Sequence, residues 1–291
     1  MKRRATQCAS DRGSRIRAAT AALIACTLSC AVALHACLAR ADTVLITGAN
    51  SGIGLEFARQ YAARGWTVIA THRRAQTPQS LVDLSVRYPK VRIESVDVTS
   101  LTQVQALAAR LHDIPIDVLI NNAGVYNDRS GCKADDEQCP GDWSVERFGK
   151  LDYRLLDTIM AVNIKGPLIV SETLYANVKA SRQKKIVAIS SSNGTLTGEA
   201  HPRPGAMFYR MSKAALNREM QIVAASTRDA GVTVLMLNPG PTLTEHQSYL
   251  SAYPGMLQTA FTVEHMIRTI DRATLADTGR FLRYDGATEP W

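Results

Sequence analysis

Two patterns of hydrophobic residues alternate along the chain from Thr43 to its end. Short runs rich in β-branched residues are typical of buried strands, and segments whose apolar residues recur every three or four positions are typical of helices that cover a sheet. The predicted strands span residues 43–48, 66–72, 91–98, 117–124, 184–190, 232–240 and 280–286. The clearest predicted helices span residues 54–65, 101–112, 151–180 and 206–226.

This alternation predicts a fold. Strands that alternate with helices indicate a parallel sheet covered on both faces, because each connection must return to the end of the sheet where the previous strand began. We therefore predict an α/β fold, a single doubly wound Rossmann domain over residues 42–291 with a mostly parallel seven-stranded sheet. One connection, roughly residues 125–150, is longer than most connections of this kind.

The first 41 residues have a different composition from the rest of the chain. Basic residues lead into residues 18–39, which contain no Asp, Glu, Lys or Arg, and Ala39 and Ala41 then form an A-x-A cleavage pattern. We predict that residues 1–41 are a cleaved export signal and that the protein is periplasmic. An inner-membrane anchor stays open as an alternative, as does a cytoplasmic protein with a misassigned start codon.

The net charge of +8 does not indicate a nucleic-acid-binding surface. Residues 1–41 hold seven Lys or Arg side chains against one Asp, so the remainder of the chain is close to neutral. Four of the six cysteines also lie there. The other two, Cys132 and Cys139, would pair in an exported protein and would stay reduced or bind metal in the cytosol, but a metal site with four ligands is not available.

A glycine-rich turn follows the first predicted strand. The sequence "TGANSGIG" places Gly48, Gly52 and Gly54 where the first helix begins. Glycine lets the backbone approach a pyrophosphate closely, and the unpaired amides of a helix N-terminus attract its negative charge. The same glycines could serve only the geometry of the turn, so the motif alone is weak evidence.

A tyrosine and a lysine lie four residues apart in "YRMSK", residues 209–213. Side chains at this spacing share one face of a helix, so the Tyr209 phenol and the Lys213 ammonium can point into the same space. A phenol beside an ammonium is a candidate proton donor. A half-buried Tyr and a snorkelling Lys on a surface helix would show the same spacing.

Taken in order, these motifs resemble the short-chain dehydrogenase/reductase superfamily. The other matching motifs are "NNAG" at 121–124, Asn163, "SSS" at 190–192 and "NPG" at 238–240. The segment "FYRMSKAALN" and the ending "GRFLRYDGATEPW" are more similar to the C-factor and sniffer-like carbonyl reductase branch than to other branches. The resemblance covers Thr43 to Trp291.

The resemblance implies a catalytic set of Asn163, Ser191, Tyr209 and Lys213. Tyr209 would donate a proton to a carbonyl oxygen while hydride reaches the carbon. Lys213 would favour the tyrosinate and hold the nicotinamide ribose. Ser191 would bond the substrate oxygen and Asn163 would anchor a water, although "HPRPG" lengthens the segment before Tyr209 and leaves Ser192 as an alternative to Ser191.

The resemblance also implies a dinucleotide site. Its residues would be Gly48, Ser51, Gly52, Ile53, Gly54, Arg73, Asp97, Val98, Asn122, Gly124, Pro239, Gly240 and Thr244, together with Tyr209 and Lys213. Where an NAD enzyme usually carries a carboxylate, at the end of the second predicted strand, this chain has His72 followed by Arg73 and Arg74. Two cations beside the ribose favour NADP(H), unless they are solvated loop charges.

We therefore predict an NADP(H)-dependent oxidoreductase that acts on a small carbonyl or alcohol as a homodimer or tetramer. We expect no nucleic-acid partner, and membrane contact only through residues 1–41. A dinucleotide-binding signalling protein of C-factor type, with little or no turnover, is the alternative. An epimerase or dehydratase of nucleotide sugars would need a larger C-terminal domain than the roughly fifty residues after Pro239.

Overall fold

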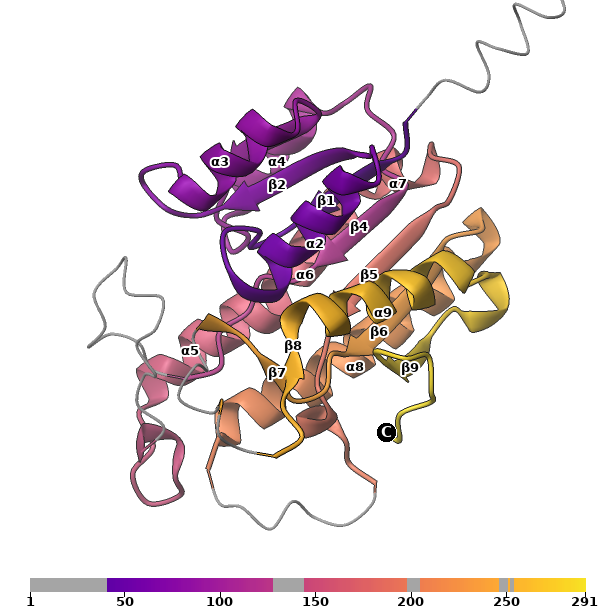
Figure 1. Ribbon diagram of the computed structural model, residues 1–291. Coiled ribbons are helices and arrows are strands. Elements are labelled where there is room, and N and C mark those ends of the chain that lie inside the picture. Colours follow the sequence, from indigo (N-terminus) through magenta and orange to yellow (C-terminus); the bar gives the residue numbers. More distant parts are fainter. Residues whose placement is uncertain (1–40, 128–143, 198–204, 246–250, 252–253) are drawn as a thin grey trace, which may run out of the picture. The chain divides into compact units, whose positions relative to one another are not determined.

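The central sheet has the strand order β3-β2-β1-β4-β5-β6-β9, and all its neighbouring strands pair in parallel (Figure 1). The structure is a computed structural model, and it describes residues 41–127, 144–197, 205–245, 251 and 254–291. The strands are β1 (Thr43–Ile46), β2 (Thr67–His72), β3 (Val91–Ser95), β4 (Val118–Asn121), β5 (Lys185–Ile189), β6 (Thr233–Asn238) and β9 (Arg280–Arg283). The predicted doubly wound α/β fold with seven strands is confirmed.

Helices cover both faces of this sheet, and each face has its own hydrophobic core. In β1, Val44 and Ile46 face one core while Leu45 faces the other, as the alternation of side chains along a strand requires. The first core lies under α2 (Gly52–Ala63), α3 (Gln79–Arg87) and α9 (Thr259–Arg272). The second lies under α4 (Leu101–Arg110), α6 (Gly166–Thr173), α7 (Tyr175–Lys179) and α8 (Met207–Thr227).

The predicted helix over residues 151–180 is confirmed between Tyr153 and Lys179, but it contains a π-turn and is interrupted at Leu174. The segment begins as α5 (Tyr153–Met160), widens into a π-turn over Ala161–Lys165, and continues as α6 and α7. Pro167 in the first turn of α6 has no N–H to donate, which favours a break in the regular hydrogen bonding at this place. Hydrophobic periodicity does not distinguish a helix with a π-turn from a straight one.

A separate pair of short strands, β7 (Thr242–Leu243) and β8 (Leu257–Gln258), lies beyond the end of β6. Strands of two residues are too short to leave a periodic pattern, and the sequence did not predict them.

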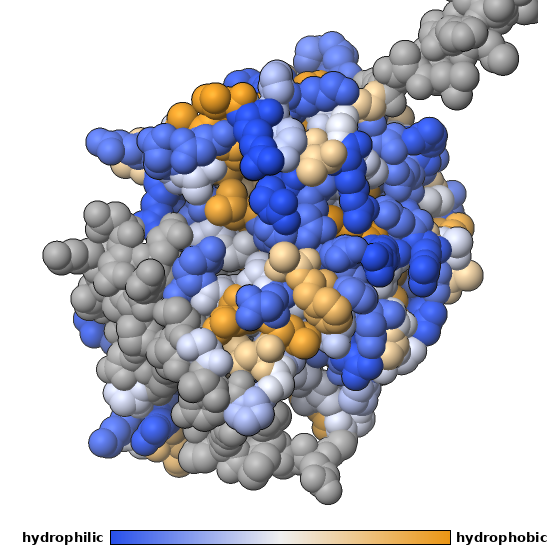
Figure 2. Space-filling model, in the orientation of Figure 1, coloured by the Kyte–Doolittle hydropathy of each residue, from blue (hydrophilic) through white to orange (hydrophobic). Residues whose placement is uncertain are grey.

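The face of the protein turned toward the reader in Figure 2 is mostly hydrophilic, with hydrophobic side chains in small clusters.

Several predictions lie outside the described residues. They concern residues 1–40, the pair Cys132 and Cys139, and most of the "HPRPG" loop. The export signal and the disulfide therefore stay predictions. Within the described ranges, no helix is long and apolar enough to span a membrane.

Candidate active site

The candidate catalytic residues meet at the carboxyl ends of the central strands. The strand order reverses between β1 and β4, and crevices at such a reversal are where open parallel sheets bind ligands. The segment after β5 contributes Ser191, and α8 contributes Tyr209 and Lys213.

Tyr209, Lys213 and Ser191 form one contact group. The Lys213 Nζ atom lies 5.6 Å from the centre of the Tyr209 ring and donates a hydrogen bond of 2.8 Å to the carbonyl oxygen of Ile189. The Ser191 hydroxyl is near enough to the Tyr209 phenol to lower its pKa, and it accepts a hydrogen bond of 3.2 Å from the Asn193 amide. The spacing of Tyr209 and Lys213 thus brings a phenol and a buried ammonium together at the end of β5.

The three serines after β5 have different surroundings. Ser190 is buried and donates to the Asn217 side chain at 2.6 Å, whereas Ser192 is exposed. The turn that begins at Ser192 packs directly on α8, since a Cβ atom added to Gly194 would lie 2.6 Å from the Lys213 carbonyl carbon. Of the three serines, Ser191 is the one whose hydroxyl lies beside Tyr209.

Burial shifts the pKa values of both titratable groups. Burial raises the pKa of the half-buried Tyr209 to about 12, the nearby Ser191 hydroxyl lowers it in part, and the nearby Tyr126 and Glu146 raise it. Burial also lowers the pKa of Lys213 to about 8. With this raised pKa, the Tyr209 phenol keeps its proton at neutral pH. Ser191 is the neighbour that lowers the pKa and so favours release of the proton.

Asn163 lies in the π-turn and uses both ends of its side-chain amide. Its Nδ2 donates to the Val125 carbonyl at 2.7 Å and to the Ser212 hydroxyl at 2.9 Å, and its Oδ1 accepts from the Val125 amide at 2.8 Å. The side chain therefore braces the segment after β4 against α8. A Cβ atom added to Gly124 would lie 3.5 Å from Asn163 Oδ1 and 3.9 Å from Lys213 Nζ.

The glycine-rich turn between β1 and α2 depends on its glycines. Gly48 and Gly52 have φ angles of 64° and 53°, a region that favours glycine. A Cβ atom on Gly54 would lie 2.2 Å from the Gly48 carbonyl oxygen. The Asn122 side chain donates to the carbonyls of Thr47 and Gly48 at 2.9 and 3.0 Å, so Asn122 holds the turn closed.

An anionic group already lies at the start of α2. The Gly52 amide donates to a carboxylate oxygen of Glu245 at 3.0 Å, across 193 residues of sequence. The neighbouring Thr244 also approaches the turn, because a Cβ atom on Gly52 would lie 3.4 Å from its methyl group. The Glu245 contact, which the sequence did not predict, is evidence that this helix end accepts negative charge.

The two arginines after β2 are available to a ligand. Arg73 is exposed and Arg74 is half-buried, and neither makes a salt bridge within the described part of the chain. His72 before them is buried, and burial lowers its pKa, so its imidazole is neutral at pH 7.

The other predicted cofactor residues line the same edge of the sheet or pack beneath it. The Asp97 carboxylate accepts from the amide and hydroxyl of Thr99 at 2.9 and 2.8 Å. Ile53 packs against the first core, and Ser51, the residue before α2, accepts from the Asn50 side chain at 3.3 Å. The remaining predicted positions are Val98, buried beside Gly166, and Pro239 and Gly240, in the turn after β6.

Comparison with known proteins gives a consistent result. The short chain dehydrogenase family matches residues 42–254. A relative named C-signal, from Myxococcus xanthus, is 30% identical over 188 residues, which cover 65% of this chain and 100% of the relative. The NADPH-bound carbonyl reductase from chicken fatty liver has a TM-score of 0.74 at 25% identity, covering 87% of this chain and 100% of that one. A Burkholderia multivorans protein with bound NADP has a TM-score of 0.68 at 30% identity, covering 86% and 100%.

Proposed function

The chain belongs to the short-chain dehydrogenase family, near its C-factor and carbonyl reductase branch, and on this premise we propose that it transfers hydride between NADP(H) and a carbonyl or alcohol substrate. The observation that carries the proposal is the contact group at the end of β5. A Tyr209 phenol that lies beside the Ser191 hydroxyl and the Lys213 ammonium has the parts needed for proton transfer to a carbonyl oxygen.

The residues present fit NADP(H). The amides at the start of α2 hold a carboxylate in this structure and would hold the diphosphate in its place. Arg73, with Arg74 as the second candidate, has no salt-bridge partner among the described residues and would bind the 2′-phosphate. Both relatives of known structure named above hold this cofactor.

The remaining predicted residues would bind the other parts of the cofactor. Asp97 and Val98 would flank the adenine, and Asn122 and Gly124 would lie near the adenosine ribose. Lys213 would bond the hydroxyls of the nicotinamide ribose. Pro239, Gly240 and Thr244 would contact the nicotinamide amide and the diphosphate.

The cofactor would supply or accept the hydride, and the side chains of this protein would move the proton. Tyr209 would give its proton to the carbonyl oxygen as negative charge develops there, and would take it back in alcohol oxidation. Ser191 would donate a hydrogen bond to the same oxygen and hold it near the phenol. Because the pKa of Lys213 is about 8, its ammonium can stabilise the tyrosinate at neutral pH and exchange a proton near pH 8.

A second candidate function is a dinucleotide-binding signalling protein with little or no turnover. The similarity to C-signal over 65% of the chain favours it. The two candidates differ in one measurable property: both bind NADPH, but only the oxidoreductase consumes it.

The test is a screen of the full-length protein for NADPH oxidation with aldehydes and ketones, and for NADP reduction with the corresponding alcohols. A fluorescence titration measures NADPH binding in parallel, and Tyr209→Phe controls for contaminating activity. Turnover that is lost in Tyr209→Phe supports the oxidoreductase. Binding without any turnover supports the signalling protein, and absence of NADPH binding contradicts both functions.

A further inference from the structure

Glu146 is a buried acidic residue that the sequence analysis did not select. It lies in a short 3₁₀ turn, Ser144–Glu146, and has no exposed surface. Its carboxylate oxygen Oε2 accepts a hydrogen bond of 3.1 Å from the amide of Tyr209, which lies 63 residues further along the chain. Burial raises the pKa of the same carboxyl group, whereas the Phe208 amide is near enough to lower it, and the second oxygen, Oε1, has no hydrogen-bond partner among the described residues. Buried carboxylates are rare unless they have partners, so this contact needs an explanation.

The N-terminus of α8 lacks a cap of its own. The residue before the helix, Ala206, has a φ angle of 53° and no side chain that could accept from the first amides of the helix. Those amides have no partner inside the helix, and a side-chain oxygen usually satisfies them. Glu146 supplies this oxygen from a distant part of the chain, at the third residue of α8.

A small hydrophobic cluster holds Glu146 in this position. Leu155, Ile159 and Phe208 form its buried centre, and Val145 packs against it from the turn that carries Glu146. The cluster therefore joins α5, the 3₁₀ turn and the first turn of α8. Backbone hydrogen bonds, including Asp152 N to the Val145 carbonyl at 3.0 Å, fix the turn from the other side.

We propose that Glu146 is a positioning residue that caps the first turn of α8 and so fixes the hydroxyl of Tyr209 beside Ser191. The inference rests on the proposed function, because it assigns Glu146 a role through the residue that would transfer the proton. Glu146 itself need not touch the substrate or the cofactor.

Tyr209 and Lys213 depend on different supports. Lys213 lies one turn deeper in α8, donates to the Ile189 carbonyl, and packs beneath Gly194. Tyr209 is the third residue of the helix, where the backbone is held by the cap. Loss of the cap should therefore move the phenol and leave Lys213 and the cofactor site in place. A displacement of about 1 Å can lower turnover on the order of 100-fold.

The test compares Glu146→Leu with Glu146→Gln. Leucine keeps the approximate size and removes the acceptor, while glutamine keeps a carbonyl oxygen that can accept from the Tyr209 amide. Glu146→Leu should lower kcat by about 10- to 100-fold and leave the Kd for NADPH within about two-fold. Glu146→Gln should retain kcat within about three-fold. In hydrogen exchange, the amide of Tyr209 should lose protection in the leucine variant alone.

Thr274 offers a control outside this cluster, because its side chain takes part in the capping box of the 3₁₀ turn Leu275–Asp277. Thr274→Ala should lower the melting temperature slightly without changing kcat. The inference is overturned if Glu146→Leu keeps the kcat of the wild type or if Glu146→Gln loses as much as Glu146→Leu. It is also overturned if the Tyr209 amide stays protected in Glu146→Leu, a readout that needs no turnover. A wild type without turnover would instead contradict the proposed function alone.

Discussion

A buried lysine ammonium lies at each end of strand β5, one from Lys185 of the strand itself and one from Lys213 of α8, and the two are held differently. At the amino end, Lys185 Nζ donates to the carbonyls of Ile270 and Asp271 at 2.6 and 3.2 Å and so caps the last turn of α9. At the carboxyl end, Lys213 Nζ donates to Ile189 and faces the Tyr209 ring. Burial lowers the pKa of both lysines, but the carboxylates of Asp271 and Asp42 oppose this shift only for Lys185.

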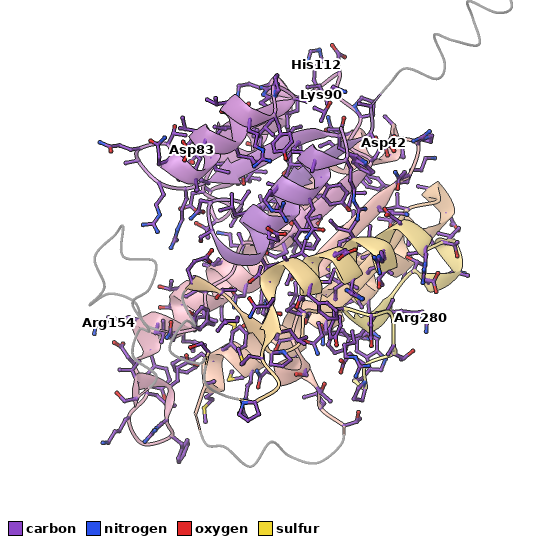
Figure 3. The ribbon with its side chains drawn as sticks, viewed as in Figure 1. Asp42, Asp83, Lys90, His112, Arg154 and Arg280 are labelled. Atoms are coloured by element: carbon purple, nitrogen blue, oxygen red, sulfur yellow. The ribbon has the colours of Figure 1, made fainter. Side chains whose placement is uncertain are left out.

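Other charged side chains at the amino end of the sheet also have several hydrogen-bond partners, as Lys185 does. Asp117 accepts from the amides of Thr43, Arg182 and Gln183, and Asp42 pairs with the Arg182 and Gln183 side chains. In Figure 3, Asp42 lies at this end of the sheet and Arg154 lies beyond the other end. The charged groups named here have protein partners, as expected where a charge serves stability. The buried hydroxyl of Tyr61, near Asp271, is an exception at this end, because it has no partner among the described residues.

At the carboxyl end, several buried polar atoms have no partner. In the part of the chain that the structure describes, these atoms include Nδ1 of His72, Oγ1 of Thr71 and Oδ1 of Asn121, which end β2 and β4. Unpaired buried polar atoms cost free energy and are expected where a ligand completes the bonding. From this comparison we infer that the groups at the amino end serve stability and that those at the carboxyl end serve the proposed function, and substitutions can test this division.

The largest effect is expected for Tyr209→Phe at the carboxyl end. Removal of the hydroxyl removes the proton donor, so turnover should fall by on the order of 10²–10⁴. The Kd for NADPH and the melting temperature should stay close to those of the wild type, because the ring still packs on α8. Steady-state kinetics, a fluorescence titration and calorimetry measure the three quantities. A variant that keeps most of its turnover would remove Tyr209 from the proposed mechanism.

Lys213→Met should affect both turnover and cofactor binding. We expect kcat to fall on the order of 100-fold and the Kd for NADPH to rise about ten-fold, because the ammonium serves the tyrosinate and the ribose. The free protein loses this charge above its pKa of about 8, so the Kd of the wild type should rise above pH 8 and stay flat below it. Lys213→Met should show no such rise. A wild-type Kd that does not change between pH 7 and about 9.5 would contradict the ribose contact.

Arg73→Ala tests whether the arginine after β2, at the carboxyl end of the sheet, binds the 2′-phosphate of the cofactor. A charge-assisted hydrogen bond to the 2′-phosphate contributes about 1.5–3 kcal/mol, so the Kd for NADPH should rise at least ten-fold while the Kd for NADH stays unchanged. Arg74→Ala tests the second candidate, and a loss of NADPH affinity in this variant instead of Arg73→Ala would assign the phosphate to Arg74. Equal losses for the two cofactors would mean that Arg73 supports the fold and does not bind the phosphate.

Local patterns predicted much of this site. The strands and the turn at Gly48–Gly54 follow from hydrophobic runs and glycine spacing, and Tyr209 and Lys213 from helical periodicity within one turn. Each of these signals lies within a few adjacent residues. The family resemblance then supplied roles that spacing alone could not give.

Contacts between distant segments could not be predicted in this way. Glu146 meets Tyr209 across 63 residues and Glu245 meets Gly52 across 193, and neither acidic residue lies in a periodic segment. Ser191 lies beside Tyr209 while Ser192 is exposed, and no pattern in "SSS" reveals this difference. The π-turn at Asn163 is hidden in a sequence that reads as a regular helix.

The smallest effect is expected at the amino end, for Lys185→Met. Methionine can fill the space of the lysine stem but leaves the carbonyls of Ile270 and Asp271 without their donor. Because a cation at a helix C-terminus contributes about 0.3–1 kcal/mol, and more when partly buried, we expect the free energy of unfolding to fall by about 1 kcal/mol. Turnover and the Kd for NADPH should be unchanged, since the substitution lies at the opposite end of β5 from Lys213. Urea denaturation and steady-state kinetics on one preparation measure both, and Lys184→Met, one residue earlier, is the control. A loss of turnover without a loss of stability would mean that the two ends of the strand are coupled, and the division between stability and function would then fail.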